Sequence, residues 1–480
     1  MTLSLQHHFV DALPELATPT QAHPFAEPRL AVLNEPLAAE LGLDVDWLRT
    51  PEGTRFLVGQ GLPDDARPVA QAYAGHQFGG YSPRLGDGRA LLLGEIETPE
   101  GLRDLALKGS GPTTYARGGD GFAALGPMLR EFLVSESMHA MGIPTTRSLA
   151  VVTTGESVLR EEGALPGAVL VRVAASHLRV GTFQYARASN QMRVLVKLAR
   201  YALERHHPED LQADNPPLAL FDHVVADQAR LVAQWLTVGF VHGVMNTDNV
   251  SIAGETIDYG PCAFLDAYSP GAVFSSIDTG GRYAYGNQPT VTQWNLARFA
   301  EALLPIITDE EAEAVEAATA VLNTFPARFN DAWMATMAAK LGLAPETEGL
   351  VDLVTELHGY LEASGVDFTT FFRDLASAAR GDREPVRGAT LELERLDAWL
   401  EKWLAHSPDA SAMDRVNPVH IPRNHLVEEA LTAASAGDLA PFEALLAAVR
   451  QPYDPIPGEE RFTQPAPAEF AATFQTFCGT

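Results

Sequence analysis

The spacing of apolar residues divides the chain into a front part with short, strand-like runs and a back part with helical periodicity. Four apolar runs of strand length lie in the front part, namely Ala90–Ile96, Leu105–Lys108, Leu149–Thr153 and Ala168–Val173. A helix is predicted from Pro127 to Met141, because proline suits a first helical turn and Gly142 and Pro144 stop the helix. Residues 1–60 are proline-rich, and we expect irregular structure there apart from a short helix over Pro36–Leu43.

From about Met192 onward, the apolar period becomes that of amphipathic helices. The predicted helices are Met192–Arg205, Leu218–Thr237, Val291–Leu304, Asp309–Leu341, Leu350–Ser364, Thr369–Ala379, Leu391–Ala405 and His425–Ala434. A short hairpin is predicted among them, with arms Val250–Ile252 and Glu255–Ile257. The pattern favours an α+β fold with two lobes, a small β-rich N-terminal lobe and a large helical C-terminal lobe. We expect an N-terminal extension and first lobe over residues 1–185, the core of the second lobe over 186–290, and its helical C-terminal part over 291–480.

Charge and composition narrow the range of partners. The 480-residue chain has 62 acidic against 34 basic residues and a net charge of -28, so it repels a nucleic-acid backbone and we expect no nucleic-acid partner. No apolar stretch is long enough to span a membrane, and Met1–Val10 lacks the pattern of a secretory signal. We therefore expect a cytoplasmic protein without membrane association, and a monomer. Two cysteines make neither a disulfide framework nor a zinc site.

The front part contains three features that are typical of phosphate binding. Glycines in Leu85–Arg89 precede a strand, where backbone N–H groups can approach phosphate oxygens, although Gly-Asp-Gly is also an ordinary turn. Lys108 ends the next strand, as the phosphate-binding lysine of a kinase does, and Glu131 lies early in the following helix. An exposed lysine and a solvated glutamate are the plain alternatives, but the two together favour an ion pair across the first lobe.

The strongest pattern lies between Val241 and Gly260. Protein kinases have a His-x-Asp loop, an asparagine five residues after that aspartate, and then a metal-binding Asp-x-Gly. Here Asn249 and Asp258 match the two oxygen ligands for Mg²⁺, which predicts a protein-kinase-like fold. Val244, however, stands where the kinase aspartate should be, and Asp248 lies directly before Asn249. Asp248 either serves a hydroxyl that approaches a different phosphorus or only caps the loop.

Two arginines lie at the end of the last predicted strand of the front part and after it. Arg172 and Arg179 lie where a kinase chain passes adenine, and arginine binds phosphate through two parallel hydrogen bonds. Surface arginines are common. If these two bind phosphates, however, ATP must be bound in the reverse of its orientation in kinases.

These motifs resemble the selenoprotein O family of protein adenylyltransferases over nearly the whole chain. The matching strings include Tyr73–Gly79, Lys108–Thr113, Arg117–Gly121, Pro144–Arg147, His242–Asn249, Ile257–Pro261, Tyr285–Pro289 and Asn417–Pro418. The resemblance implies that ATP binds reversed and that AMP is transferred to Ser, Thr or Tyr hydroxyls of target proteins with Mg²⁺, or with Mn²⁺, which could also allow UMP transfer. It implies nucleotide contacts at Gly86, Gly88, Arg89, Lys108, Asp120, Gly121, Arg172, Arg179 and Asp258, a Lys108 partner at Glu131, a proton acceptor at Asp248, and metal ligands at Asn249 and Asp258.

Two alternatives to this activity and one question about the tail stay open. One is a small-molecule or protein kinase, against which Val244 counts, and another is a pseudokinase scaffold that binds ATP without turnover. The third concerns the tail, which ends in Cys478 where some relatives carry selenocysteine. Cys478 pairs with Cys262 in a regulatory disulfide under one hypothesis, and both thiols are unpaired under the other.

Overall fold

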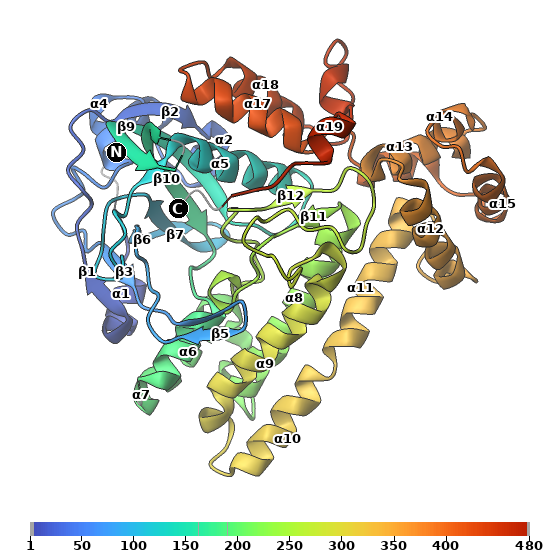
Figure 1. Ribbon diagram of the computed structural model, residues 1–480. Coiled ribbons are helices and arrows are strands. Elements are labelled where there is room, and N and C mark those ends of the chain that lie inside the picture. Colours follow the sequence, from blue (N-terminus) through green and yellow to red (C-terminus); the bar gives the residue numbers. More distant parts are fainter. Residues whose placement is uncertain (1–3, 162, 190, 478–480) are drawn as a thin grey trace.

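An antiparallel eight-stranded sheet forms the front part of the protein. The computed structural model describes residues 4–161, 163–189 and 191–477 (Figure 1). The strand order is β1-β3-β6-β7-β10-β9-β2, with β8 paired to β10. The bounds are β1 Ala17–Pro19, β2 Arg29–Leu33, β3 Val69–Gln71, β6 Ala90–Thr98, β7 Gly101–Lys108, β8 Ala123–Ala124, β9 Arg147–Arg160 and β10 Gly163–Ala174. All four predicted strands are present, and each is longer than its apolar run.

In residues 1–60 the predicted short helix over Pro36–Leu43 is present as α2, but the expectation of irregular structure in the rest of the segment is wrong. Strands β1 and β2 from this segment form the two ends of the strand order, and four short helices accompany them, α1 His8–Ala12, α2 Glu35–Glu40, α3 Val45–Leu48 and α4 Pro51–Phe56. Strands of three and five residues are too short to show a period among prolines, so the sequence pattern did not indicate them.

Both faces of the sheet are covered, as the continuous apolar run in β10 requires. Val169 and Val171 face the larger core, whereas Ala168 and Leu170 pack with residues of α5 (Leu125–Ala140), α17 (Asn424–Ser435) and α18 (Ala440–Val449). Helices α17 and α18 come from the C-terminal part of the chain and lie beside α5 at the top of Figure 1. The C-terminal part therefore contributes to the core of the front part.

Helices make up most of the remaining chain. Their bounds are α6 Val180–Ala188, α7 Met192–His206, α8 Pro216–Thr237, α9 Gln288–Ile307, α10 Glu311–Leu322, α11 Phe325–Lys340, α12 Leu350–Ser364, α13 Phe368–Ala379, α14 Glu384–Gly388, α15 Leu393–Leu404, α16 Ala410–Val416 and α19 Ala468–Ala471. The single helix predicted over Asp309–Leu341 is wrong, because α10 ends before Pro326 and α11 begins around it. Within the described residues, no helix has both the length and the apolar character needed to cross a bilayer.

The hairpin predicted over Val250–Ile257 is also wrong. Its first arm forms a bridge at Ser251 with Arg179, and its second arm forms a bridge at Thr256 with Thr145. Each arm therefore pairs with a different distant segment, which sequence spacing cannot reveal. Two small sheets lie nearby, β4 Gly75–Gln77 with β5 Gly80–Ser82, and β11 Phe240–Val241 with β12 Ala263–Phe264.

Candidate active site

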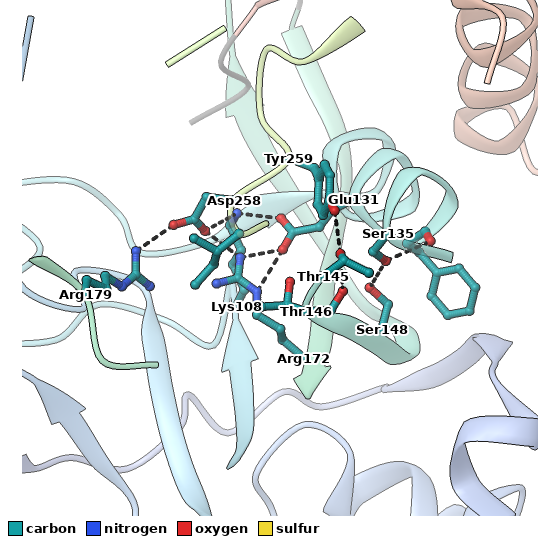
Figure 2. A network of polar contacts seen from close by, with 12 residues as sticks. Lys108, Glu131, Ser135, Thr145, Thr146, Ser148, Arg172, Arg179, Asp258 and Tyr259 are labelled. Carbon is teal, nitrogen blue, oxygen red and sulfur yellow. Dashed lines mark hydrogen bonds and ion pairs between the residues drawn. The ribbon is translucent and has the colours of Figure 1, made fainter. Parts of the chain in front are cut away.

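A buried ion-pair network lies between the sheet and the loops that follow α8. Lys108 ends β7, and its Nζ lies 2.6 Å from Oε2 of Glu131 on α5. Arg172, on the adjacent strand β10, donates from Nε to Oε1 of the same glutamate over 2.8 Å. Figure 2 shows these side chains converging with Asp258. The contact expected between Lys108 and Glu131 is thus present, and Arg172 shares it.

Asp258 joins this network from the other side. Its carboxylate lies 2.5 Å from Arg172 Nη2, 2.6 Å from Arg179 Nη1 and 3.3 Å from Lys108 Nζ. Burial alone would raise the pKa of Asp258, but the charges of Arg172, Arg179 and Lys108 outweigh it and hold that pKa well below its usual range. The backbone of Asp258 has a φ of 63°, a left-handed conformation that is uncommon for an aspartate and is typical of functional sites.

Three cations meet in this network. Lys108, Arg172 and Arg179 are paired there with two carboxylates, Glu131 and Asp258. Two further buried carboxylates, Asp87 and Asp248, also interact with Arg179. In a protein whose net charge is -28, these three cations are the groups of the site that can bind an anion.

Asp248 lies in a single 3-10 turn, Thr247–Asn249, beside Arg179. Arg179 Nη1 donates to the backbone oxygen of Asp248 over 2.7 Å. The carboxylate is 8% exposed, its Oδ1 has no hydrogen-bond partner, and its Oδ2 lies 3.4 Å from Gln77 Nε2. Burial raises the pKa of Asp248 to about 6. A buried carboxylate with an unpartnered oxygen is well suited to accept a proton near neutral pH.

Asn249 is oriented by a hydrogen bond to the loop that contains Val244. Its Nδ2 donates to the backbone oxygen of Val244 over 3.0 Å, which leaves the side-chain oxygen as its ligand atom. With the carboxylate of Asp258 it forms a pair of hard oxygen donors, the type that Mg²⁺ or Mn²⁺ prefers. The residues present therefore fit a divalent ion, although Asp258 would exchange part of its ion pairing to bind one.

The glycine-rich segment makes close contacts that require glycine. Gly86 has a φ of 68°, and a Cβ there would lie 2.3 Å from the ring of Tyr115. Gly121 has a φ of 73°, and a Cβ there would lie 2.1 Å from the backbone of Pro112. These glycines and Gly88 border the same loop, and the backbone oxygen of Arg89 accepts from Gly109 N over 2.8 Å.

Asp120 lies apart from the ion-pair network. Its carboxylate is 2.8 Å from Arg160, accepts from Phe122 N over 3.0 Å, and is 46% exposed. Of the predicted nucleotide contacts, the structure thus brings Lys108, Arg172, Arg179 and Asp258 into direct contact with one another or with Glu131. It places Gly86, Gly88, Arg89, Asp120 and Gly121 in the neighbouring loops.

Polar side chains line a small cavity behind this network. Its lining residues are Gln71, Asp87, Ala90, Ala106, Leu107, Lys108, Arg172, His177 and Arg179. Sequence reasoning gave no role to Asp87 or His177. It also missed Tyr73, whose ring lies 4.8 Å from the Arg179 guanidinium, and Gln77, which contacts Asp248. Tyr73 and Gln77 belong to the string Tyr73–Gly79, which carried the resemblance and was the available signal.

Two further candidates concern thiols and metals. Cys262 is buried, and burial raises the pKa of its thiol to about 12, while Cys478 lies outside the described residues. A second group of metal-ligand types, His207, Glu209 and His223, has ligand atoms within 4.8 Å of one another. It was not found from the sequence, because His223 lies on α8, whereas His207 and Glu209 lie in the turn that follows α7.

The cation-rich cleft, with a buried carboxylate and two oxygen donors beside it, is typical of enzymes that act on phosphate groups. The family model described as "Protein adenylyltransferase SelO" matches residues 1–450. The chain belongs to this family, as the resemblance implied, and it is a nucleotidyltransferase.

Relatives agree over the full length of the chain. A protein named "Protein nucleotidyltransferase YdiU" from Pseudarthrobacter chlorophenolicus is 60% identical, with 100% of this chain and 99% of the relative covered. Proteins of the same name from Mycolicibacterium paratuberculosis and Cereibacter sphaeroides are 60% and 53% identical, again with 100% of this chain covered and with 99% and 100% of the relative covered.

Proposed function

We propose that this enzyme transfers AMP from ATP to Ser, Thr or Tyr hydroxyls of target proteins and releases pyrophosphate. The observation that carries the proposal is the placement of Arg172 and Arg179 on Asp258, with the buried Asp248 next to the proposed metal ligand Asn249. These arginines suit the β- and γ-phosphates, so the α-phosphorus would face Asp248 and the acceptor.

The lining of the small cavity supports a reversed nucleotide. In a kinase, the adenine ring occupies an apolar slot between the lobes. Here, beside Ala90 and Ala106, the cavity is lined by the charged side chains of Lys108, Arg172 and Arg179. An uncharged ring would gain no hydrogen bond from these three cations, whereas phosphate oxygens could accept hydrogen bonds from each of them.

The contacts also support a protein-kinase-like arrangement of two lobes. The Lys108–Glu131 pair joins a strand of the sheet to α5, and Asp258 reaches the same lysine from the loop after Asn249. These are the roles that kinases give to a strand lysine, a helix glutamate and a metal-binding aspartate. Under this proposal the first lobe holds residues 1–185, and the second holds the catalytic core over 186–290 and the helices over 291–480.

Asn249 and Asp258 would hold a divalent ion, with Mg²⁺ as the default and Mn²⁺ as an alternative that takes the same ligands. Such an ion would supply positive charge to the phosphate oxygens of the nucleotide. Transfer of UMP with Mn²⁺ would be a variant of the same reaction.

Asp248 would act on the acceptor hydroxyl. The hydroxyl oxygen forms a bond to the α-phosphorus, the bond from that phosphorus to the bridging oxygen breaks, and pyrophosphate leaves. The proton of the hydroxyl passes to the carboxylate of Asp248, whose Oδ1 has no other partner. Lys108, Arg172 and Arg179 hold the departing pyrophosphate and stabilise its charge.

The test is a labelling experiment with purified enzyme, a mixture of cytoplasmic proteins and Mg²⁺. ATP labelled at the α-phosphate should label protein, and ATP labelled at the γ-phosphate should not. Labelling from the γ-phosphate alone would establish a kinase instead. Bound but unconverted ATP with no labelling would establish a scaffold. An Asp258→Ala variant serves as the control, because it removes a metal ligand and should abolish the signal.

We also propose that Cys262 forms a regulatory disulfide with Cys478. Thr476 lies close by, since its hydroxyl donates to the backbone oxygen of Pro261 over 2.8 Å. Peptide mapping of the oxidised protein without reductant should find the two cysteines in one linked peptide. Free thiols at both positions would end this proposal.

Gel filtration should show a monomer, and fractionation should place the protein in the cytoplasm.

A further inference from the structure

A hairpin next to Asp248 carries two exposed aromatic side chains, Phe78 and Tyr81, and the partly buried Arg282 and Trp294 lie beside it. The transfer chemistry leaves this group without a role. We call this group the hairpin patch. It consists of the β4–β5 hairpin, Gly75–Ser82, together with Arg282 and Trp294. The patch begins beside Asp248 and extends to Arg282, in the segment before α9, and to Trp294 on α9.

The hairpin is fixed to the loop that carries Asp248. His76 N donates to Thr247 Oγ1 over 2.7 Å, and Phe78 N donates to Asn246 Oδ1 over 3.0 Å. Gly75 lies so close to Asp248 that a Cβ at this position would come within 2.5 Å of Oδ1. A ligand held by the hairpin would therefore have a defined position relative to the proton-accepting carboxylate.

Two large aromatic side chains on the hairpin are exposed. Phe78 is 40% exposed and Tyr81 is 44% exposed. Phe78 also has a φ of 50°, an uncommon conformation for a bulky residue that the hydrogen bonds to Asn246 and Tyr283 maintain. Strain of this kind persists where the surroundings impose it and is frequent at ligand-binding positions. Exposed aromatic side chains held in place are typical anchors for a protein partner.

Arg282 adds a positive charge that forms no ion pair with any carboxylate of the described residues. Its guanidinium lies 4.6 Å from the ring centroid of Trp294 and against Gly79 at the hairpin turn. Among the described residues, no carboxylate lies within ion-pair distance of it, and its Nε is buried without a hydrogen-bond partner. The nearby Asp278 accepts from two backbone N–H groups, and Arg298 on the other side of Trp294 is paired with Glu301 at 2.7 Å.

We infer that the hairpin patch docks the acceptor segment of a target protein, and that Arg282 selects segments with a carboxylate close to the reacting hydroxyl. The inference rests on the proposed transfer of AMP to proteins. An aromatic ring holds a flat guanidinium in place without neutralising it, so Arg282 is prepared for an acidic side chain. Because the net charge of -28 repels acidic proteins in general, a local unpaired cation is the place where such a segment would be accepted.

The test uses synthetic peptides with one central tyrosine, flanked by glutamates, by glutamines or by lysines, and ATP labelled at the α-phosphate. The wild-type enzyme should label the glutamate peptide with the highest kcat/KM. Arg282→Glu should lower kcat/KM for that peptide by about fivefold or more and should favour the lysine peptide, since it turns attraction into repulsion. Arg282→Lys should keep the glutamate preference. Arg29→Glu, an equal change of charge at an exposed position on β2, should leave the preference unchanged.

Three controls and outcomes separate this inference from the transfer activity itself. Binding of labelled ATP should be equal in the wild type and in the Arg282 variants, which excludes misfolding. Equal labelling of the three peptides by the wild type, or an Arg282→Glu variant with an unchanged order of peptides, would overturn the docking role. Labelling of the chain itself but of no peptide would also overturn it. Absence of α-label on every protein and peptide would instead contradict the proposed function.

Discussion

At the scale of one residue, the buried carboxylate of Asp248 lowers the stability of the fold and suits the proposed proton transfer. Its carboxylate is buried, has one oxygen without a partner, and titrates near pH 6 instead of near 4. The charged form is therefore less favourable in the folded protein than in the unfolded chain. A carboxylate whose pKa is raised by burial in this way is typical of a proton acceptor.

The substitution Asp248→Asn should separate catalysis from binding. It should reduce AMP transfer by about 10²–10⁴-fold, because the amide cannot accept the hydroxyl proton, and leave ATP affinity unchanged. Rates with α-labelled ATP, together with a direct binding measurement, check this. A variant that transfers AMP at the wild-type rate would show that Asp248 only caps its loop.

Lys340 is a second residue whose burial has a measurable consequence. It is 2% exposed, its Nζ lies 4.1 Å from the ring centroid of Phe372, and loss of hydration lowers its pKa to about 7. Above pH 7 the folded protein loses this proton while the unfolded chain retains it until about pH 10. The stability of the wild type should therefore rise with pH across this window, by the sign of the proton linkage.

Lys340→Met should consequently raise the free energy of unfolding by about 1–3 kcal/mol near pH 6.5, and by less near pH 9.5. Denaturant titrations at the two pH values measure the difference. Lys402→Met, at an exposed lysine paired with Glu356, is the matched control and should show no such trend. If Lys340→Met raises the free energy of unfolding equally at both pH values, the charge on this lysine does not destabilise the fold.

At the scale of elements, the active site depends on contacts between short segments that are distant in sequence. The β4–β5 hairpin positions Asp248, the bridge between Arg179 and Ser251 fixes the loop before Asp258, and β10 brings Arg172 beside Lys108. The residues that make these contacts lie on strands, in turns or in loops, and none of them lies on a long helix. The proposed catalytic groups are therefore held by tertiary contacts rather than by a single rigid element.

Gly75→Ala should test how strictly the hairpin positions the carboxylate. The added Cβ would lie 2.5 Å from Asp248 Oδ1, so that either the carboxylate or the hairpin must move. A displacement of about 1 Å at a reacting group lowers rates on the order of 10²-fold, and we expect that loss of AMP transfer with nearly unchanged thermal stability. Gly126→Ala, where no atom lies within 4 Å of the added Cβ, is the control and should retain activity. Full activity in Gly75→Ala would show that the hairpin does not constrain Asp248.

At the scale of the whole molecule, the sequence predicted what depends on apolar periodicity and on strong motifs. The sheet strands around Lys108, the Lys108–Glu131 contact and the change to helices after Met192 follow from such signals. The arms at Ser251 and Thr256 were assigned to each other because their true partners, Arg179 and Thr145, are far away in sequence. Strand pairing of this kind is decided by tertiary packing, which a local pattern does not contain.

The same limit applies to the site. Motifs pointed to the charged residues of the ion-pair network and to the proposed metal ligands, but not to the residues that contact and position them. Tyr73 against Arg179 and Gln77 at Asp248 are contacts between the first part of the chain and the catalytic loop, and neither residue type is unusual in its local context. The packing of α17 and α18 against the front part could likewise not be predicted, because the sequence of an amphipathic helix does not specify which surface the helix covers.

The central claim is that the nucleotide binds with its triphosphate toward Arg172 and Arg179 and its base toward the outside. A crystal structure of the enzyme with a non-hydrolysable ATP analogue and Mg²⁺ tests this most directly. We predict phosphate oxygens within hydrogen-bond distance of Lys108, Arg172 and Arg179, and the α-phosphorus facing Asp248. An adenine ring between Ala90 and Ala106, with the terminal phosphate pointing outward, would contradict the account.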